Sequence, residues 1–147
     1  MHKPEKKEAV VQVASLPAQN DEIAFEEYDI TLMAVGDNLL HMGIVNAGKQ
    51  PDGSRNYDFL FDGISAFLEK ADVKIINQET IFGGNGLDFH GYPKFNSPTE
   101  AGDAIARAGF NVVLQATNHT ADQGMSGMEN CIDFWKTHPE VTCYGYS

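Results

Sequence analysis

The sequence predicts an α/β fold with a mostly parallel sheet. Runs rich in branched and aromatic residues alternate with longer amphipathic segments in the order β-α-β-α-β-α-β. This alternation is typical of strands joined by right-handed helical crossovers. The chain of 147 residues is long enough for one domain of ordinary size.

Four segments have the composition of strands, and each ends close to a glycine or a polar cluster. The first, YDITLMAVG, ends at Gly36, and the second, DVKIINQE, contains three branched apolar residues. The predicted strands are residues 28–36, 72–79, 110–117 and 141–146. A loop with a short helical turn is expected after the first strand.

Three segments are predicted as helices. The first, residues 57–71, has Phe59, Leu60, Ile64, Phe67 and Leu68 at helical spacing. In the second, Ser97 is expected to be the cap, with Pro98 at the first position, Glu100 three residues after the cap and Gly109 at the end. The third covers residues 125–138.

The segment TIFGGNGLDFHGYPKFNSP, residues 80–98, shows no period and is longer than an ordinary connection, as functional loops often are. Its glycines match neither a Walker loop nor GxGxxG, and the chain contains no GxSxG nucleophile motif. His90 in this loop is expected to be an exposed loop residue.

The composition excludes some classes of function. The net charge of −11 argues against nonspecific binding to nucleic acid, which needs clustered Lys and Arg, and against docking on an anionic membrane. Cys131 and Cys143 form no CxxC motif and are expected to be small core residues. Residues 1–27 show no sustained period and are predicted to be a flexible linker ahead of a domain over residues 28–147.

Polar clusters follow three of the predicted strands. Because the carboxyl ends of parallel strands lie on one edge of a sheet, these clusters should lie close together. They contain carboxylate, imidazole and amide groups. These groups suit a site for Mn, Fe, Zn or Mg better than a structural zinc site, in which the ligands are thiolates. The candidate residues are Asp37, His41, Asn77, Glu79, Asn118, His119 and Asp122.

Each candidate has a simpler explanation when taken alone. A lone aspartate after a strand is more often a turn residue, and an isolated loop histidine such as His41 is more often packed than functional. Asn118 suits a left-handed turn, and Asn118-His119-Thr120 also matches a glycosylation sequon. The combination at three strand ends is what favours a site.

Four stretches together resemble the CapA family of bacterial capsule and poly-γ-glutamate biosynthesis proteins, which are related to calcineurin-like metallophosphatases. These stretches are MAVGDNLLH, ADVKIINQET, FNSP and AGFNVVLQATNHTADQGMSGMENCIDFW. The resemblance covers roughly residues 29–147. It implies a layered αβ(βα) metallophosphatase-like fold, of which residues 28–147 would be the N-terminal part.

The resemblance also implies roles for the candidate residues. Metal ligands would be Asp37, His41, Asn77, Glu79 and Asn118. His119 would donate a proton to a leaving group or stabilise charge, and Asp122 would orient His119 or bind metal. The spacing from Asp37 to His41 is wider than the Asp-x-His of the superfamily. Glu79 stands in place of its bridging aspartate, and Asn96 and Ser97 are further candidates for ligand contact.

Family members continue further and supply more histidine ligands for a dinuclear metal site. We therefore expect this chain to be a partial domain that binds divalent metal weakly and shows little or no turnover. Three hypotheses remain open: a metal-dependent hydrolase of a phosphoester or polymer, a non-catalytic component that binds an anionic polymer, and an incomplete α/β domain with a degenerate site. The resemblance implies a location at the cell envelope outside the cytoplasm, with membrane-bound capsule synthesis components as partners. Self-association through an exposed sheet edge is also expected.

Overall fold

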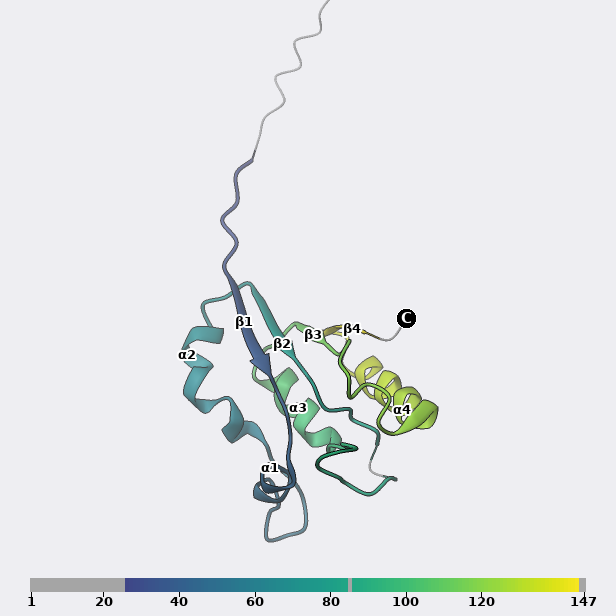
Figure 1. The fold of residues 1–147 in the computed structure, drawn as a ribbon. Helices are drawn as coiled ribbons and strands as arrows, with labels where there is room; N and C mark the ends of the chain where they lie inside the picture. Colours follow the sequence, from purple (N-terminus) through teal and green to yellow (C-terminus); the bar gives the residue numbers. More distant parts are fainter. Residues whose placement is uncertain (1–25, 85, 146–147) are drawn as a thin grey trace, which may run out of the picture.

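The computed structural model describes residues 26–84 and 86–145, and in them four strands form one parallel sheet (Figure 1). The strands are β1 (Leu32–Asp37), β2 (Val73–Asn77), β3 (Val112–Leu114) and β4 (Thr142–Tyr144), in the spatial order β1-β2-β3-β4. The predicted α/β class with a parallel sheet is confirmed. Of the predicted linker over residues 1–27, all but the last two residues lie outside the described part of the chain.

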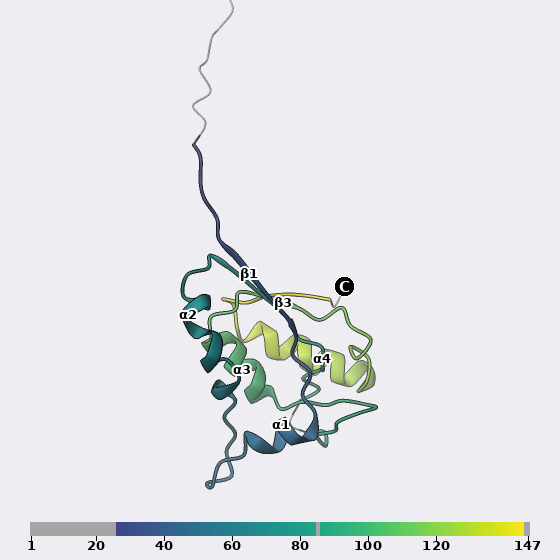
Figure 2. The same cartoon turned by 60° about the vertical axis from the view of Figure 1, so that its left-hand side comes forward.

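The helices lie on one side of this sheet. They are α1 (Met42–Ala47), α2 (Ser65–Leu68), α3 (Thr99–Arg107) and α4 (Gly124–Lys136). Each strand pairs with the next strand along the chain, and the connections between parallel strands are right-handed crossovers. The helices in these connections therefore lie on the same face of the sheet. Figure 2 shows α3 and α4 beneath the strands in this way. The core lies between, where Ile76 and Val113 of the sheet pack with residues such as Ile105 and Trp135 of the helices.

The single helix predicted for residues 57–71 is wrong. The segment contains two 3₁₀ turns, η1 (Asp58–Leu60) and η2 (Asp62–Ile64), before the short α2. Its buried side chains are Tyr57, Phe61, Leu68 and Ala71. Phe59 and Phe67, which were expected on the buried face, are 44% and 63% exposed. The side chains that are buried therefore differ from those that helical spacing predicted. The backbone forms tighter 3₁₀ turns in this segment instead of one continuous α-helix.

The predicted role of Ser97 as a helix cap is also wrong. Pro98 is the residue before α3, and no side chain in the described residues caps this helix. Ser97 is fully buried, and its hydroxyl donates to Thr80 Oγ1 at 2.8 Å while its backbone N–H donates to the carbonyl of Ile81. The residue therefore fastens the two ends of the long loop together. The predicted end of the helix at Gly109 agrees with its positive φ of 91°.

A buried glutamine organises the core beneath β3 and β4. Gln115 Oε1 accepts a hydrogen bond from Trp135 Nε1 at 2.6 Å and lies 3.4 Å from the Sγ atoms of Cys131 and Cys143. Both cysteines pack in or against the core, as the sequence predicted. Three donors therefore surround the buried side-chain oxygen of Gln115, so it is not an unpaired polar group in the core.

The Cys143 thiol is expected to resist alkylation in the folded protein. Burial, with a smaller contribution from the neighbouring Cys131, raises its pKa to about 12, and only the thiolate is nucleophilic. Native chain at pH 8.5 should therefore react much more slowly with iodoacetamide than chain in denaturant, as measured by mass spectrometry. Because the pKa is raised in the folded state, the same thiol should favour unfolding as the pH rises above its ordinary value. Equal labelling rates in the two states would contradict the burial.

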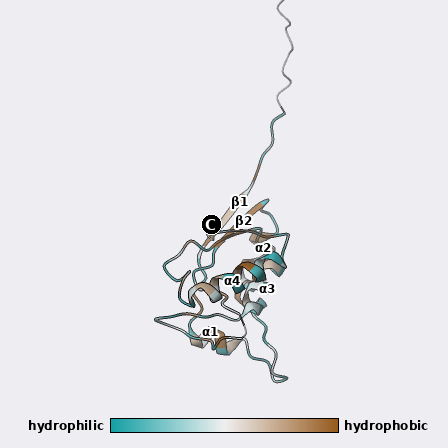
Figure 3. Cartoon of the chain, turned by 90° about the vertical axis from the view of Figure 1, so that its right-hand side faces the viewer, coloured by the Kyte–Doolittle hydropathy of each residue, from teal (hydrophilic) through white to brown (hydrophobic). Residues whose placement is uncertain are grey.

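The face of the sheet opposite the helices is apolar and open within the described residues. Strand register places paired residues on the same face, and Leu114 pairs with Tyr144. On this open face Leu32 is 59% exposed, Tyr144 is 60% exposed and Leu114 is 38% exposed. Hydrophobic colour extends along β1 and β2 in Figure 3. Parallel sheets are normally covered on both faces, so this open face is an unusual feature.

Candidate functional site

The carboxyl ends of β1 and β2 bring two of the candidate residues into direct contact. Asp37 pairs with Asn77 in register, after an irregularity that leaves Gly36 without a partner. Asn77 Nδ2 donates a hydrogen bond to Asp37 Oδ1 at 2.6 Å. A bulge of this kind changes the direction of the next side chain, and here it places the carboxylate beside the amide of the neighbouring strand.

His119 lies between two carboxylates at the ends of β2 and β3. Its Nδ1 is 2.7 Å from Asp122 Oδ2, and its Nε2 is 3.9 Å from Glu79 Oε1. The three side chains are between 12% and 18% exposed. Since the Asp122 carboxylate can only accept, Nδ1 carries the proton toward it and Nε2 is left for another partner.

The loop that carries His119 is fixed to β2 by a threonine. Thr117 Oγ1 donates to the backbone carbonyl of Glu79 at 2.8 Å and accepts from the backbone N–H of His119 at 3.1 Å. This hydroxyl sets the distance between the two strand ends. It explains why the polar run TNHTAD is a defined structure rather than a loose turn.

Phe95 connects His41 to the group around His119. Its role was not predicted from the sequence. Its ring centroid is 4.6 Å from that of His119 and 5.1 Å from that of His41, and both contacts are T-shaped. Its backbone N–H donates to Asp122 Oδ2 at 2.7 Å, the same oxygen that binds His119. The available signal was the FNSP stretch, in which this phenylalanine is the first residue.

The other candidates occupy different environments. His41 and Asn118 are exposed, and His90 is exposed as expected. Asn96 is fully buried, and its Oδ1 accepts from the backbone N–H of Gly83 at 2.8 Å. Asn96 and Ser97 therefore hold the long loop in shape, and neither side chain reaches the surface.

Several of the candidate residues have side chains of the types that bind divalent metal. Asp37, Asn77, Glu79 and His41 are of the right chemical type for a divalent cation. However, nowhere in residues 26–84 and 86–145 do three His, Cys, Asp or Glu side chains converge closely enough to hold a metal ion. The site consists instead of an Asp37–Asn77 pair and a Glu79–His119–Asp122 group, with His41 connected through Phe95. These residues therefore supply donors of a suitable type without a complete set of ligands.

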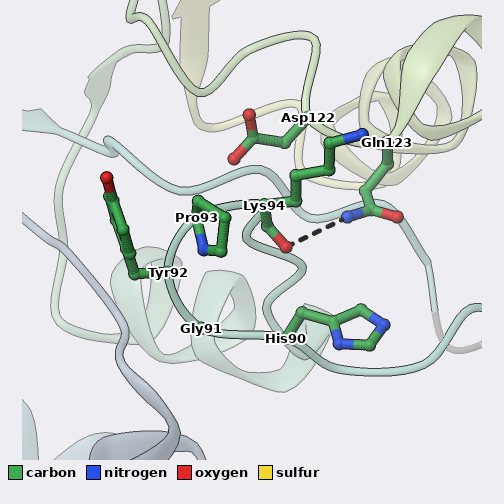
Figure 4. A pocket seen from close by; sticks show the side chains of 7 residues that line it. All are labelled: His90, Gly91, Tyr92, Pro93, Lys94, Asp122 and Gln123. Atoms are coloured by element: carbon green, nitrogen blue, oxygen red, sulfur yellow. Dashed lines mark hydrogen bonds between the residues drawn. The ribbon is translucent and has the colours of Figure 1, made fainter.

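A hollow of about 590 Å³ lies next to Asp122, between the loop over residues 90–94 and the start of α4 (Figure 4). Its lining residues are His90, Gly91, Tyr92, Pro93, Lys94, Asp122 and Gln123. Asp122 thus belongs both to the hollow and to the group around His119.

The fold is an α/β fold with a four-stranded parallel sheet, and it is consistent with part of a metallophosphatase-like domain. The chain belongs to the bacterial capsule synthesis protein family PGA_cap, whose family model matches residues 31–146. The resemblance recognised in the sequence is thereby confirmed, and the chain is placed among proteins of bacterial capsule synthesis.

Two curated proteins of Sinorhizobium fredii are similar to this chain. They are described as uncharacterized protein y4uA and uncharacterized protein y4sH, and each is 32% identical over 104 residues, or 67% of this chain. The chain spans 21% of the length of each of these relatives. In the described part of the chain, no helix has the length and apolar character needed to cross a membrane.

Proposed function

We propose that this capsule synthesis protein carries the proton-transfer part of a hydrolase site. The observation that supports the proposal most strongly is His119, held through Nδ1 by Asp122 with Nε2 directed toward Glu79. An imidazole fixed in one tautomer by a carboxylate is the usual arrangement of a general acid or base. Its substrate would be a phosphoester or the backbone of an envelope polymer.

In this mechanism each residue has a separate role. His119 Nε2 gives a proton to the leaving oxygen or takes one from an attacking water. Asp122 keeps the ring oriented and stabilises the imidazolium that forms, while Glu79 supplies a second negative charge near the same ring. Phe95 packs against the ring edge and restricts its rotation.

We also propose that divalent metal (Mn, Fe, Zn or Mg) binds at the strand ends, with Asp37, His41, Asn77, Glu79 and Asn118 as candidate ligands. The chemical type of these donors supports this proposal. We expect a dissociation constant for Mn²⁺ no tighter than about 10⁻⁴ M, as in sites with few charged ligands. A dinuclear centre would need ligands beyond those described.

Metal titration combined with a turnover assay tests both parts of the proposal. Calorimetry with Mn²⁺ and Zn²⁺ should show weak binding that Asp37→Ala reduces further. Hydrolysis of p-nitrophenyl phosphate should be slow or undetectable, and His119→Ala should remove any rate above background without changing metal affinity. Robust metal-dependent turnover by the chain would contradict the expected weak site. A measurable rate that survives in His119→Ala would contradict the role of His119.

A second candidate function is a non-catalytic component that binds an anionic polymer in a capsule synthesis machine. Polymer binding with no turnover at any metal concentration would support this candidate, whereas turnover that depends on His119 would support the hydrolase. In either case we propose an envelope location outside the cytoplasm, with membrane-bound synthesis components as partners.

We further propose that the chain self-associates through its uncovered sheet. The strand edges β1 and β4 and the open face between them expose Leu32, Leu114 and Tyr144. Sedimentation should show mass increasing with concentration, and the double variant Leu32→Lys/Tyr144→Ser should remain monomeric. Phe67→Ser, which alters an equally exposed aromatic residue on α2, is the matched control and should associate like the parent chain. Association that is unchanged in the double variant would place the contact elsewhere.

A further inference from the structure

A buried glutamine at the end of β2 contacts residues beside both parts of the candidate site. Asn77 and Glu79 are partly exposed at this strand end. Gln78 and Thr80, which alternate with them, are fully buried. Alternation of this kind is the period of a strand, and it continues here beyond the last residue of β2. The Gln78 side chain therefore points into the protein from a position between two candidate residues.

The oxygen of this side chain is bonded to the residue that follows Asp37. Gln78 Oε1 accepts a hydrogen bond from Asn38 Nδ2 at 2.6 Å. The backbone N–H of Asn38 donates to the carbonyl of Asn77 at 2.8 Å. The chain after the bulge in β1 is thus attached to β2 through its backbone and through the Asn38 side chain. These contacts keep the Asp37 carboxylate beside Asn77, to which it is also bonded directly.

The nitrogen of the same side chain holds the other part of the site. Gln78 Nε2 donates to the carbonyl of Thr80 at 2.6 Å and to its hydroxyl oxygen at 3.1 Å. The first of these bonds closes a turn across Glu79, because it joins the residue before Glu79 to the residue after it. The carbonyl of Glu79 also accepts from the Thr117 hydroxyl. The backbone of Glu79 is therefore fixed on two sides, and its carboxylate lies 3.9 Å from His119 Nε2.

Glutamine has the chemical properties that this position needs. Its amide supplies one acceptor and one donor group, and here Asn38 uses the first while Thr80 uses the second. A carboxylate in this place would turn an oxygen toward the Thr80 carbonyl and add negative charge beneath a site that already contains several carboxylates. An apolar side chain would leave both partners without this hydrogen bond.

We propose that Gln78 is a positioning residue, and that its amide fixes the separation between the Asp37–Asn77 pair and the group around His119. A ligand that contacts both parts then binds more tightly, because the protein loses less conformational freedom on binding. Gln78 is fully buried, so it acts on a ligand only through its neighbours. This inference rests on the proposed function, since the separation of the two parts matters only if a metal ion or substrate contacts both.

The test compares two buried glutamines. Gln78→Met keeps the length of the side chain and removes both contacts. Gln115→Met is the matched control, since Gln115 is 2% exposed and bonds to Trp135 in the core. Both variants should unfold at a lower temperature than the parent chain. Only Gln78→Met should shift the ¹⁵N signals of the His119 ring, and only Gln115→Met should shift the indole N–H signal of Trp135.

Titration with Mn²⁺ alone gives a second measurement, which a general loss of stability does not change. Gln78→Met should weaken Mn²⁺ binding about tenfold, the usual effect of removing a residue that orients metal ligands. Gln115→Met should bind Mn²⁺ like the parent chain. Asn38→Ala removes only the contact at the end of β1, at a partly exposed position, and provides a variant that folds even if Gln78→Met does not. It should weaken Mn²⁺ binding and leave the His119 ring signals unchanged.

Three results would overturn the proposal: parental His119 ring signals and Mn²⁺ affinity in Gln78→Met, equal changes of both in Gln115→Met, or parental Mn²⁺ affinity in Asn38→Ala. The outcome is separable from the proposed function. If the parent chain binds no Mn²⁺, the metal proposal fails and the ring signals alone decide the role of Gln78. Turnover that depends on His119 but is the same in Gln78→Met would remove the positioning role and keep the hydrolase.

Discussion

Replacing Asp122 with asparagine should both release His119 and loosen the loop over residues 90–96. Asp122 Oδ2 accepts hydrogen bonds from both His119 Nδ1 and the backbone N–H of Phe95, each at 2.7 Å. An asparagine oxygen in the same position can still accept from both donors, but it carries no charge and makes weaker hydrogen bonds, and an amide turned the other way presents its NH₂ donor to both of them. Because the side chain is only 13% exposed, the free energy of unfolding should fall by about 1–3 kcal/mol. His119 should also populate both neutral tautomers instead of one.

Denaturant unfolding measures the first effect, and the ¹⁵N shifts of the imidazole ring measure the second. Asp133→Asn is the matched control, since Asp133 pairs with Lys136 on α4 and its side chain is 72% exposed. This control should change stability by less than about 0.5 kcal/mol, as surface pairs usually do. An Asp122→Asn variant with parental stability and a single His119 tautomer would show that the carboxylate does not orient the ring.

The second large effect is expected at Gly102, where α3 passes the aromatic part of the core. A Cβ atom added there would overlap the Phe134 ring and lie 2.9 Å from Cε2 of Phe82. These rings are packed on one another with centroids 5.5 Å apart, so neither can move freely. Gly102→Ala should therefore lower the free energy of unfolding by about 3 kcal/mol through overpacking, even though alanine favours a helix.

The matched control is Gly43→Ala in α1. A Cβ atom at Gly43 has no neighbouring atom within 4 Å, and the residue is exposed. Because the added methyl group meets no other atom, the higher helix propensity of alanine should dominate at this position. The free energy of unfolding should rise by about 0.5–1 kcal/mol. Thermal or urea unfolding of the two variants should thus give opposite signs. A stabilised Gly102→Ala variant would show that the rings yield more easily than their packing suggests.

The alternation of strands and helices could be predicted because it depends on local patterns. Each strand contains adjacent branched or apolar residues, as in the run Val-Lys-Ile-Ile of β2, and α3 ends before the positive-φ Gly109. The segment 57–71 could not be predicted, since Arg107 of α3 binds Asp58 in η1 at 2.7 Å and Tyr57 is buried in the core. Contacts of this kind depend on residues distant in sequence and override the helical spacing.

The candidate site, like the fold, could be predicted only in part. The strand-end rule predicted that Glu79, His119 and Asp122 lie together, and the structure places these side chains in contact range. It could not predict the role of Phe95, because the position of this residue depends on the antiparallel bridge between His90 and Asn96. Ser97 was misinterpreted because a serine before a proline looks the same in sequence whether its hydroxyl caps a helix or bonds to Thr80.

The strand order also has a consequence for how the chain folds. Each strand pairs with the strand that precedes it in sequence, so the sheet can grow one strand at a time as the polypeptide leaves the ribosome. No strand has to wait for a partner synthesised much later, but each parallel pair joins residues separated by a whole helical crossover, so each pairing step is slower than closing a hairpin. The group around His119 needs the third strand, so β1 and β2 can be in place before the residues that would perform chemistry have emerged.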